Sequence, residues 1–330
     1  MSRFVRRWAR AAVVVLVGGA LGAQGVGAAV AADEVPGAAF PGAAAGEAAN
    51  GLPTYRCSQL WNAALGVVVD TTVEGNVVVD AEADWGCAMH EVTVTGDVTV
   101  PVGGRLTGAP LTVGGDLRVA GHADVSGYRE DSAVDGDVLL EGRADVSLDL
   151  GARAVGGDVL LDGGVGSVFW IRAASVGGGV TGRVGSATLH GVAVAGAYDV
   201  AVEGTTRLRG GTSVAGPVTV RGGRLLVHDV TVGRDLTVDG AGDVLVCRAD
   251  VADDLLVTRL TDYARIGVER DLPCATRVGG SLVLVDVPHS VDLGDVDVAR
   301  HLVCSGVSGP RGVTRTPALR VGGGEYGSCR

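Results

Sequence analysis

The stretches VTGDVTV from Val94, VGGDLRV from Val113 and VDGDVLL from Val134 are copies of one motif. Its consensus is V-x-G-[D/N]-[V/L]-x-[V/L], and from Val73 to Val298 successive copies begin 18 to 21 residues apart, except for one interval of 27. Self-similarity at a period of this length is typical of a solenoid built from stacked coils. The motif begins at Val73, Val94, Val113, Val134, Val155, Val176, Val194, Val214, Val232, Val251, Val278 and Val298, with a thirteenth start at Val321.

Each coil contains at least two short segments in which apolar and polar residues alternate, which is the pattern of strands. A second apolar position lies further along many coils, for example at Leu106, Val125, Val146 and Val244. Abundant Gly and β-branched Val disfavour helices. We therefore predict an all-β fold, a single-stranded parallel β-helix (β-solenoid) of about 12 coils of roughly 20 residues each. The variable coil length favours the right-handed form. The third motif position, Gly, is expected to leave room for a corner or a left-handed backbone.

The first residues resemble an export signal. Arg3, Arg6, Arg7 and Arg10 precede an apolar run at 11–20, and the cleavage pattern Ala29-Val30-Ala31 follows. This order is that of a secretory signal peptide cleaved near Ala31. The Arg6-Arg7 pair leaves the choice between general secretion and twin-arginine export open. We expect a secreted, extracellular protein.

Three segments are predicted from this pattern. Residues 1–31 form the signal peptide, residues 32–51 a flexible linker rich in Pro, Gly and Ala, and residues 52–330 the β-solenoid. We expect an N-terminal cap around Cys57 and Trp61, and a C-terminal cap after Cys304 that a disulfide closes. Caps are needed because the ends of a solenoid expose unpaired strand edges.

The charge of the chain limits its partners. There is no Lys, so all 27 basic residues are Arg, and the net charge is −11. Removal of the four N-terminal arginines, with no acid, moves it to −15. An acidic surface disfavours nucleic acid and anionic membranes. No second apolar stretch reaches transmembrane length, so we expect no transmembrane segment.

Six cysteines remain after signal cleavage, and an even number in an oxidising compartment predicts disulfides. Neighbouring cysteines in the sequence are separated by roughly one coil, which brings them to similar angular positions. We predict the pairs Cys57–Cys87, Cys247–Cys274 and Cys304–Cys329, two at the ends and one across the longest coil. No spacing matches a zinc site, so we expect no metal-binding cysteines.

A repeated aspartate is the most suggestive polar feature. Asp97, Asp116, Asp137 and Asp158 occupy the same motif position in four successive coils. Stacked carboxylates about 5 Å apart repel by roughly 1 kcal/mol in water, so arginines, raised pKa values or bound Ca²⁺ should offset the repulsion. The simpler alternative is that each aspartate hydrogen-bonds its own turn. A Ca²⁺ ladder is therefore a hypothesis, and Ca²⁺ is the only cofactor we consider.

No catalytic residue is predicted. The acidic doublet Asp253-Asp254 is the one candidate for glycosidase-like chemistry, and Asp254 occupies the ladder position of its motif. The histidines are scattered, with none at metal-ligand spacing in the sequence. The aromatic residues Phe169, Trp170 and Tyr263 are too isolated to predict a sugar-stacking platform, and core or cap positions are expected for them.

The repeat resembles that of a family of uncharacterised secreted actinobacterial proteins with V-x-G-N-V-x-V about every 20 residues. The matching residues are the motif copies across 73–304, VCSG at 303–306 and VGGGEYGSC at 321–329. The resemblance implies a β-solenoid and no particular activity, and this chain departs from it by using Asp where the family usually has Asn. A looser similarity exists to bactofilins, cytoskeletal β-helices that polymerise end to end.

These observations favour a secreted, non-enzymatic structural or binding scaffold, whose partner is a glycan, a cell-envelope polymer or a protein. Two alternatives stay open: a polysaccharide lyase or hydrolase, and a self-assembling extracellular filament. The oligomeric state is not predicted. The longest coil, from Val251 to Val278, is where we expect a specific partner, because insertions in solenoids form loops on one face.

Overall fold

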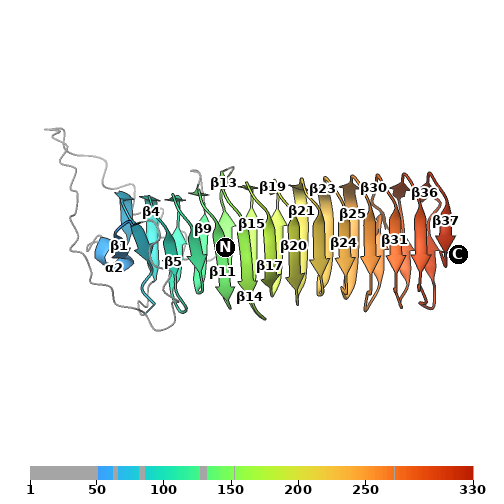
Figure 1. Cartoon of the computed structure of the whole chain (residues 1–330), viewed down its shortest axis with the longest axis horizontal. Helices are drawn as coiled ribbons and strands as arrows, with labels where there is room; N and C mark the ends of the chain where they lie inside the picture. The colour runs from blue at the N-terminus through green and yellow to red at the C-terminus, as the bar shows by residue number, and fades with distance from the viewer. Residues whose placement is uncertain are drawn as a thin grey trace. The chain divides into compact units, whose positions relative to one another are not determined.

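The structure is a computed structural model that describes residues 51–61, 66–81, 86–126, 132–151, 153–270 and 272–329. The predicted signal peptide, and the predicted linker up to residue 50, lie outside the described residues. In the part of the chain that is described, strands dominate and no helix is long and apolar enough to cross a membrane. The predicted all-β solenoid is confirmed (Figure 1). The right-handed sense stays a prediction.

One parallel sheet of 14 strands forms what we call the first face. Apart from the first strand, which precedes the first motif copy, each of its strands begins at or next to the fifth motif position, and each strand pairs with the equivalent strand one coil away. The strands are β1 (Thr54–Arg56), β3 (Asn76–Val78), β5 (Val98–Val100), β8 (Leu117–Val119), β11 (Val138–Gly142), β14 (Val159–Gly163), β17 (Val180–Val184), β20 (Tyr198–Val202), β22 (Val218–Arg221), β24 (Leu236–Asp239), β26 (Leu255–Thr258), β31 (Leu282–Val285), β34 (Leu302–Ser305) and β37 (Glu325–Gly327).

A second sheet, of 21 strands, contains two parallel ladders that we call the second and third faces. Five of its strands bend at the corner and contribute to both ladders: β2 (Val68–Val73), β4 (Cys87–Val94), β21 (Thr205–Val214), β23 (Arg224–Val232) and β25 (Asp243–Val251). The second face also contains β6 (Arg105–Gly108), β9 (His122–Ser126), β12 (Asp145–Asp149), β15 (Val168–Arg172), β18 (Ser186–His190), β27 (Ala264–Ile266), β32 (Val291–Leu293) and β35 (Val313–Arg315). The third face also contains β7 (Leu111–Val113), β10 (Ala133–Val134), β13 (Ala154–Val155), β16 (Ser175–Val176), β19 (Ala193–Val194), β30 (Thr276–Val278), β33 (Val296–Val298) and β36 (Arg320–Val321).

The core is a set of stacked aliphatic columns. The first motif valine ends each third-face strand, and it pairs with its counterpart one coil away from Val73↔Val94 through Val298↔Val321. From Val73 to Val298 these valines are at most 5% exposed. The second apolar positions, such as Leu106 and Val244, are buried as well. The periodic motif therefore predicts both the coil length and the inward side chains correctly.

Glycine at the third motif position is required by close approach between coils. A Cβ added to Gly136 would lie 2.5 Å from Oδ1 of Asp116 and 2.6 Å from the carbonyl oxygen of Gly115. Gly136 does not have a positive φ, so the predicted left-handed backbone is wrong here and the predicted corner is right. The left-handed region is used instead between the second and third faces, where Asp229 and Arg248 have φ of 57° and 50°.

Three disulfides join Cys57 to Cys87, Cys247 to Cys274 and Cys304 to Cys329, with Cα atoms 5.9, 5.4 and 5.0 Å apart. All three predicted pairs are confirmed. Each bond joins residues 25 to 30 positions apart in the sequence. By the chain-entropy model, a loop of this length stabilises the fold by roughly 3 kcal/mol.

The two ends of the described solenoid differ from its middle. At the N-terminal end, the short helix α2 (Cys57–Leu60) buries Cys57 completely, and the indole Nε1 of Trp61 lies 3.2 Å from Sγ of Cys57. At the other end, Arg315 continues the core column of Ile266 and Leu293.

Glu325 likewise continues the core column of Leu282 and Leu302 on the first face. The guanidinium of Arg315 donates to both carboxylate oxygens of Glu325, at 2.9 and 2.8 Å, and to the carbonyl oxygen of Cys329. An ion pair therefore covers the last apolar coil.

Candidate binding site on the third face

The longest coil forms a small hairpin that leaves the solenoid at the corner between the second and third faces. Strands β28 (Val268–Glu269) and β29 (Leu272–Pro273) pair antiparallel, and the N–H of Cys274 donates to the carbonyl oxygen of Gly267 at 2.9 Å. The Cys247–Cys274 disulfide ties the base of the hairpin to β25. Leu272 is 70% exposed, so the hairpin presents an apolar side chain to solvent. The 27-residue interval thus marks a real insertion.

Each third-face strand presents one outward side chain, and together these form what we call the outer column. In the first nine coils the side chains at this position are small and uncharged, and Ala133 among them is buried. In the last four coils they are charged and alternate in sign. In order, the residues are Thr72, Thr93, Thr112, Ala133, Ala154, Ser175, Ala193, Ser213, Thr231, Asp250, Arg277, Asp297 and Arg320.

The charged half of the outer column lines a hollow of about 630 Å³. Its side chains include Arg277, Asp297 and Arg320 from the outer column and Asp229 and Arg248 from the adjoining corner. Within the described ranges, the column members have no oppositely charged atom within 4.0 Å, so their charges are available to a ligand. The segment returning from the hairpin, at Ala275 and Thr276, lines the same hollow.

A second hollow of about 400 Å³ lies over the small residues Ser175, Ala193 and Ser213, and it also includes Thr231, which lines the charged hollow too. The third face therefore offers an uncharged track that leads into a charged one. A ligand that extends along the coils could contact both.

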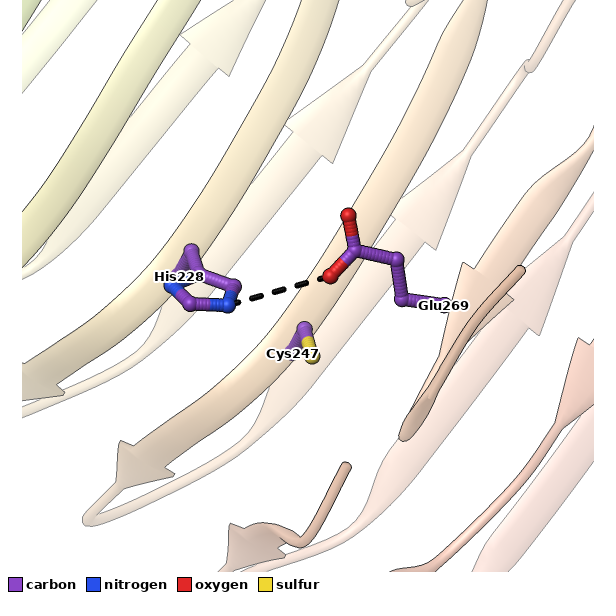
Figure 2. A group of neighbouring side chains, drawn as sticks. All are labelled: His228, Cys247 and Glu269. Atoms are coloured by element: carbon purple, nitrogen blue, oxygen red, sulfur yellow. Dashed lines mark ion pairs between the residues drawn. The ribbon is translucent and has the colours of Figure 1, made fainter. Parts of the chain in front are cut away.

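A polar cluster lies beside the charged hollow, at the base of the hairpin. Nδ1 of His228 lies 3.0 Å from a carboxylate oxygen of Asp229, and its Nε2 lies 3.8 Å from a carboxylate oxygen of Glu269 (Figure 2). The guanidinium of Arg248 lies 3.2 and 2.5 Å from the two ring nitrogens and pairs with Asp229 at 2.8 Å. The ligand-type atoms of His228, Cys247 and Glu269 all lie within 4.8 Å of one another.

No spacing signal in the sequence indicates this cluster, because the hairpin brings Glu269 back to His228 and Cys247. In contrast, the charged outer column does have a signal that our sequence analysis missed. Each of its members immediately precedes the first valine of a motif copy, as Arg277 precedes Val278 and Arg320 precedes Val321.

The predicted aspartate ladder forms, but by a different bond from the one expected. The backbone N–H of each aspartate donates to Oδ1 of the aspartate one coil earlier. The bonds run from Asp116 to Asp97 at 2.9 Å, from Asp137 to Asp116 at 3.0 Å, and from Asp158 to Asp137 at 2.7 Å. The prediction that each aspartate bonds its own turn is wrong, because the donor lies one coil further along.

Asn76 begins the ladder in the same way, and Asp158 ends it on Gly179. Backbone dipoles therefore offset part of the repulsion between carboxylates, and Arg118 pairs with Asp116 at 3.2 Å.

The other residues considered from the sequence do not line the charged hollow. Asp254 is a rung of a shorter ladder, with its Oδ1 accepting the N–H of Ser281 at 2.6 Å, and Asp253 lies 4.0 Å from Arg234. Phe169 is fully buried, as predicted. Tyr263 is 41% exposed, so the core or cap position expected for it is wrong, and its ring lies 5.2 Å from the guanidinium of Arg265.

The chain was compared with protein-family models, curated proteins and solved structures, and none of them matches. The β-solenoid that the actinobacterial resemblance implies is present, while membership of that family stays a prediction.

Proposed function

We propose that the protein is a secreted, non-enzymatic binding scaffold whose partner lies along the third face, with its charged groups in the hollow beside the hairpin. The observation that supports this most directly is the row of four exposed charges, Asp250, Arg277, Asp297 and Arg320, next to the longest coil; within the described residues none of the four has an oppositely charged atom within 4.0 Å. The register places each of these charges next to one of opposite sign, but such exposed pairs stabilise a fold by only about 0.2–1 kcal/mol, so the charged groups stay accessible to a partner.

The chemistry of the hollow favours a partner that has both acidic and basic groups. Arginines can bind carboxylates or phosphates through paired hydrogen bonds, and the intervening aspartates accept from amino groups. Equivalent charges recur every second coil, or about 9.6 Å at a strand spacing of about 4.8 Å. A repetitive cell-envelope polymer or an extended peptide segment matches such a row better than a small molecule does.

The ends of the solenoid favour a discrete scaffold over the filament alternative. End-to-end stacking would bury the last coil against another chain, and there the Arg315–Glu325 pair occupies core positions. Burying an ion pair at an interface without further partners costs several kcal/mol of desolvation per ion. The helix α2 and Trp61 cover the opposite end.

A binding screen tests the proposal. Purified mature protein is presented with a panel of glycans, cell-wall polymers and extended peptides, with and without Ca²⁺, and reaction products are measured in parallel. We expect saturable binding without turnover. Replacement of Arg277 and Arg320 by Ala should weaken it at least tenfold, since charge-assisted hydrogen bonds are worth about 1.5–3 kcal/mol each.

Arg277→Ala and Arg320→Ala are also measured singly, and the matched control for each is Arg183→Ala, which removes one exposed arginine from the first face. If Arg183→Ala weakens binding as much as replacement of Arg277 or Arg320 does, binding depends only on net charge, and a third-face site is contradicted. Product formation would instead favour the enzyme alternative and direct attention to Asp253 and Asp254. Binding that appears only with Ca²⁺ would make the ladder of Asp97, Asp116, Asp137 and Asp158 a cation site.

A further inference from the structure

We propose that the base of the hairpin is a redox-gated zinc site, in which Cys247 and Cys274, once reduced, bind Zn²⁺ together with His228 and Glu269. This inference does not depend on the proposed scaffold function. Thiolate, imidazole and carboxylate are the donor types that Zn²⁺ prefers in four-coordinate protein sites. The structure brings all of them to one corner of the solenoid.

The geometry is close to what such a site requires. Donor atoms around a tetrahedral zinc lie about 3.5 Å apart, given metal–ligand distances of about 2.0–2.3 Å. Here Nε2 of His228 and the nearer oxygen of Glu269 are 3.8 Å apart, and Sγ of Cys247 completes a group within 4.8 Å (Figure 2). Cys274 is bonded to Cys247, so its sulfur lies beside the same group. Side-chain rotations alone can close the remaining distance.

The position of a neighbouring carboxylate is compatible with zinc binding through Nε2 of His228. Asp229 lies 3.0 Å from Nδ1 of His228, whereas Glu269 lies 3.8 Å from the other ring nitrogen, Nε2. A carboxylate beside Nδ1 favours the tautomer whose lone pair is on Nε2, the nitrogen that approaches Glu269, and known zinc sites use a carboxylate beside histidine in this way. Asp229 holds this place at a left-handed backbone position, φ 57°, where Gly191 and Gly210 stand in the preceding coils.

The disulfide of this site is the most accessible of the three. Cys274 is half-buried, whereas the other five cysteines are at most 1% exposed. Because thiol–disulfide exchange requires access to a sulfur atom, a reductant reaches this bond first.

The redox step is balanced by a dithiol, which becomes a disulfide and supplies two electrons and two protons to Cys247 and Cys274. Zn²⁺ then displaces the two thiol protons, because metals bind the thiolate form.

Arg248 is the competitor for this site. Its guanidinium lies 2.5 Å from Nε2 of His228 in the disulfide form, and it also pairs with Asp229. Zinc binding requires this exposed side chain to turn away. Removing it should therefore strengthen zinc binding rather than weaken it, whereas removing a ligand should do the opposite.

The test uses the full mature chain, reduced with a limiting amount of a dithiol that is then removed, and titrated anaerobically with Co²⁺ and then Zn²⁺. We expect one Co²⁺ per reduced chain, with the thiolate charge-transfer and tetrahedral ligand-field absorption bands, and none in the oxidised chain. His228→Ala and Glu269→Gln should each weaken binding at least about tenfold, and Asp229→Asn about 10–100-fold. Arg248→Ala should bind more tightly.

His190→Ala is the matched control, since His190 lies in the same outward row of the second face, two coils away from His228. Its affinity should equal that of the unaltered chain. If His228→Ala and Glu269→Gln also bind as the unaltered chain does, the two thiols alone chelate the metal and the proposal is overturned. Failure of the reduced chain to bind Co²⁺ or Zn²⁺ would overturn it as well.

Discussion

Replacing one aspartate of the ladder separates its charge from its hydrogen bond. Asp137 is the best position, because Oδ1 accepts the N–H of Asp158 at 2.7 Å while Asp116 and Asp158 lie one coil away on either side. Asn at this position keeps the acceptor, as Asn76 already does for Asp97 at 2.8 Å. Ala removes both the charge and the acceptor.

The magnitudes follow from the geometry. Each neighbouring carboxylate, about 5 Å away, repels Asp137 by roughly 1 kcal/mol in water, so Asp137→Asn relieves about 2 kcal/mol at low salt. The hydrogen bond to an amide is weaker than that to a carboxylate by about 1 kcal/mol. Asp137→Asn should thus raise the free energy of unfolding by about 1 kcal/mol at low salt. Near 1 M salt the repulsion is screened, and the variant should be about 1 kcal/mol less stable than the unaltered chain.

Asp137→Ala should be less stable than Asp137→Asn by about 1 kcal/mol at every salt concentration, because the half-exposed N–H of Asp158 loses its acceptor. Urea unfolding at low and high salt gives the free energy of unfolding of the unaltered chain and of both variants. Asp124→Asn is the control, since its in-register neighbours Thr107 and Ser147 are uncharged and its stability should not depend on salt in this way. If Asp137→Asn is no more stable than Asp137→Ala at low salt, or is less stable there than the unaltered chain, the reasoning fails.

Three further predictions concern the coil contact, the end and one surface pair. Gly136→Ala should lower the free energy of unfolding by about 1–3 kcal/mol in urea unfolding, because the added Cβ meets the backbone of the preceding coil. Gly164→Ala should be neutral, because the position has open space around it. Equal destabilisation by the two changes would contradict the role of close coil contact at Gly136. The double change Arg315→Leu and Glu325→Val should turn the last coil into an exposed apolar surface and produce end-to-end dimers in sedimentation velocity. The swapped pair, Arg315→Glu with Glu325→Arg, should sediment as the unaltered chain does. An unchanged sedimentation profile of the Leu/Val double variant would show that the ion pair does not prevent stacking. The hydrogen bond from Arg259 lowers the pKa of Asp239 in the folded chain. This pair therefore stabilises the fold fully above the ordinary aspartate pKa of about 3.9, and its contribution is lost as the pH falls through the lower folded pKa. The difference in Tm between the unaltered chain and Arg259→Ala should shrink on acidification, and a difference that grows would refute the assignment.

The C-terminal end of the solenoid, which the Arg315–Glu325 pair covers, is only partly predictable from the sequence. Glu325 stands at the fifth position of the motif copy that begins at Val321, a position that is apolar in most other coils. A charged residue there indicates either a broken repeat or an end. Arg315 has no such marker, because the segment before it departs from the repeat, and its core position appears only in its pairing with Leu293.

The sequence by itself determined the coil period, the inward valines and the disulfide partners, because each depends on local alternation and on spacing along a quasi-one-dimensional stack. The same repeat contains the outer column from Thr72 to Arg320, one residue before each motif. Only the tertiary structure decided two things. The aspartates bond the next coil rather than their own turn, since that depends on how closely coils approach at Gly136. The hairpin returns Glu269 to His228 and Cys247, since an insertion that breaks the period is positioned by its own turn and disulfide and by no repeat.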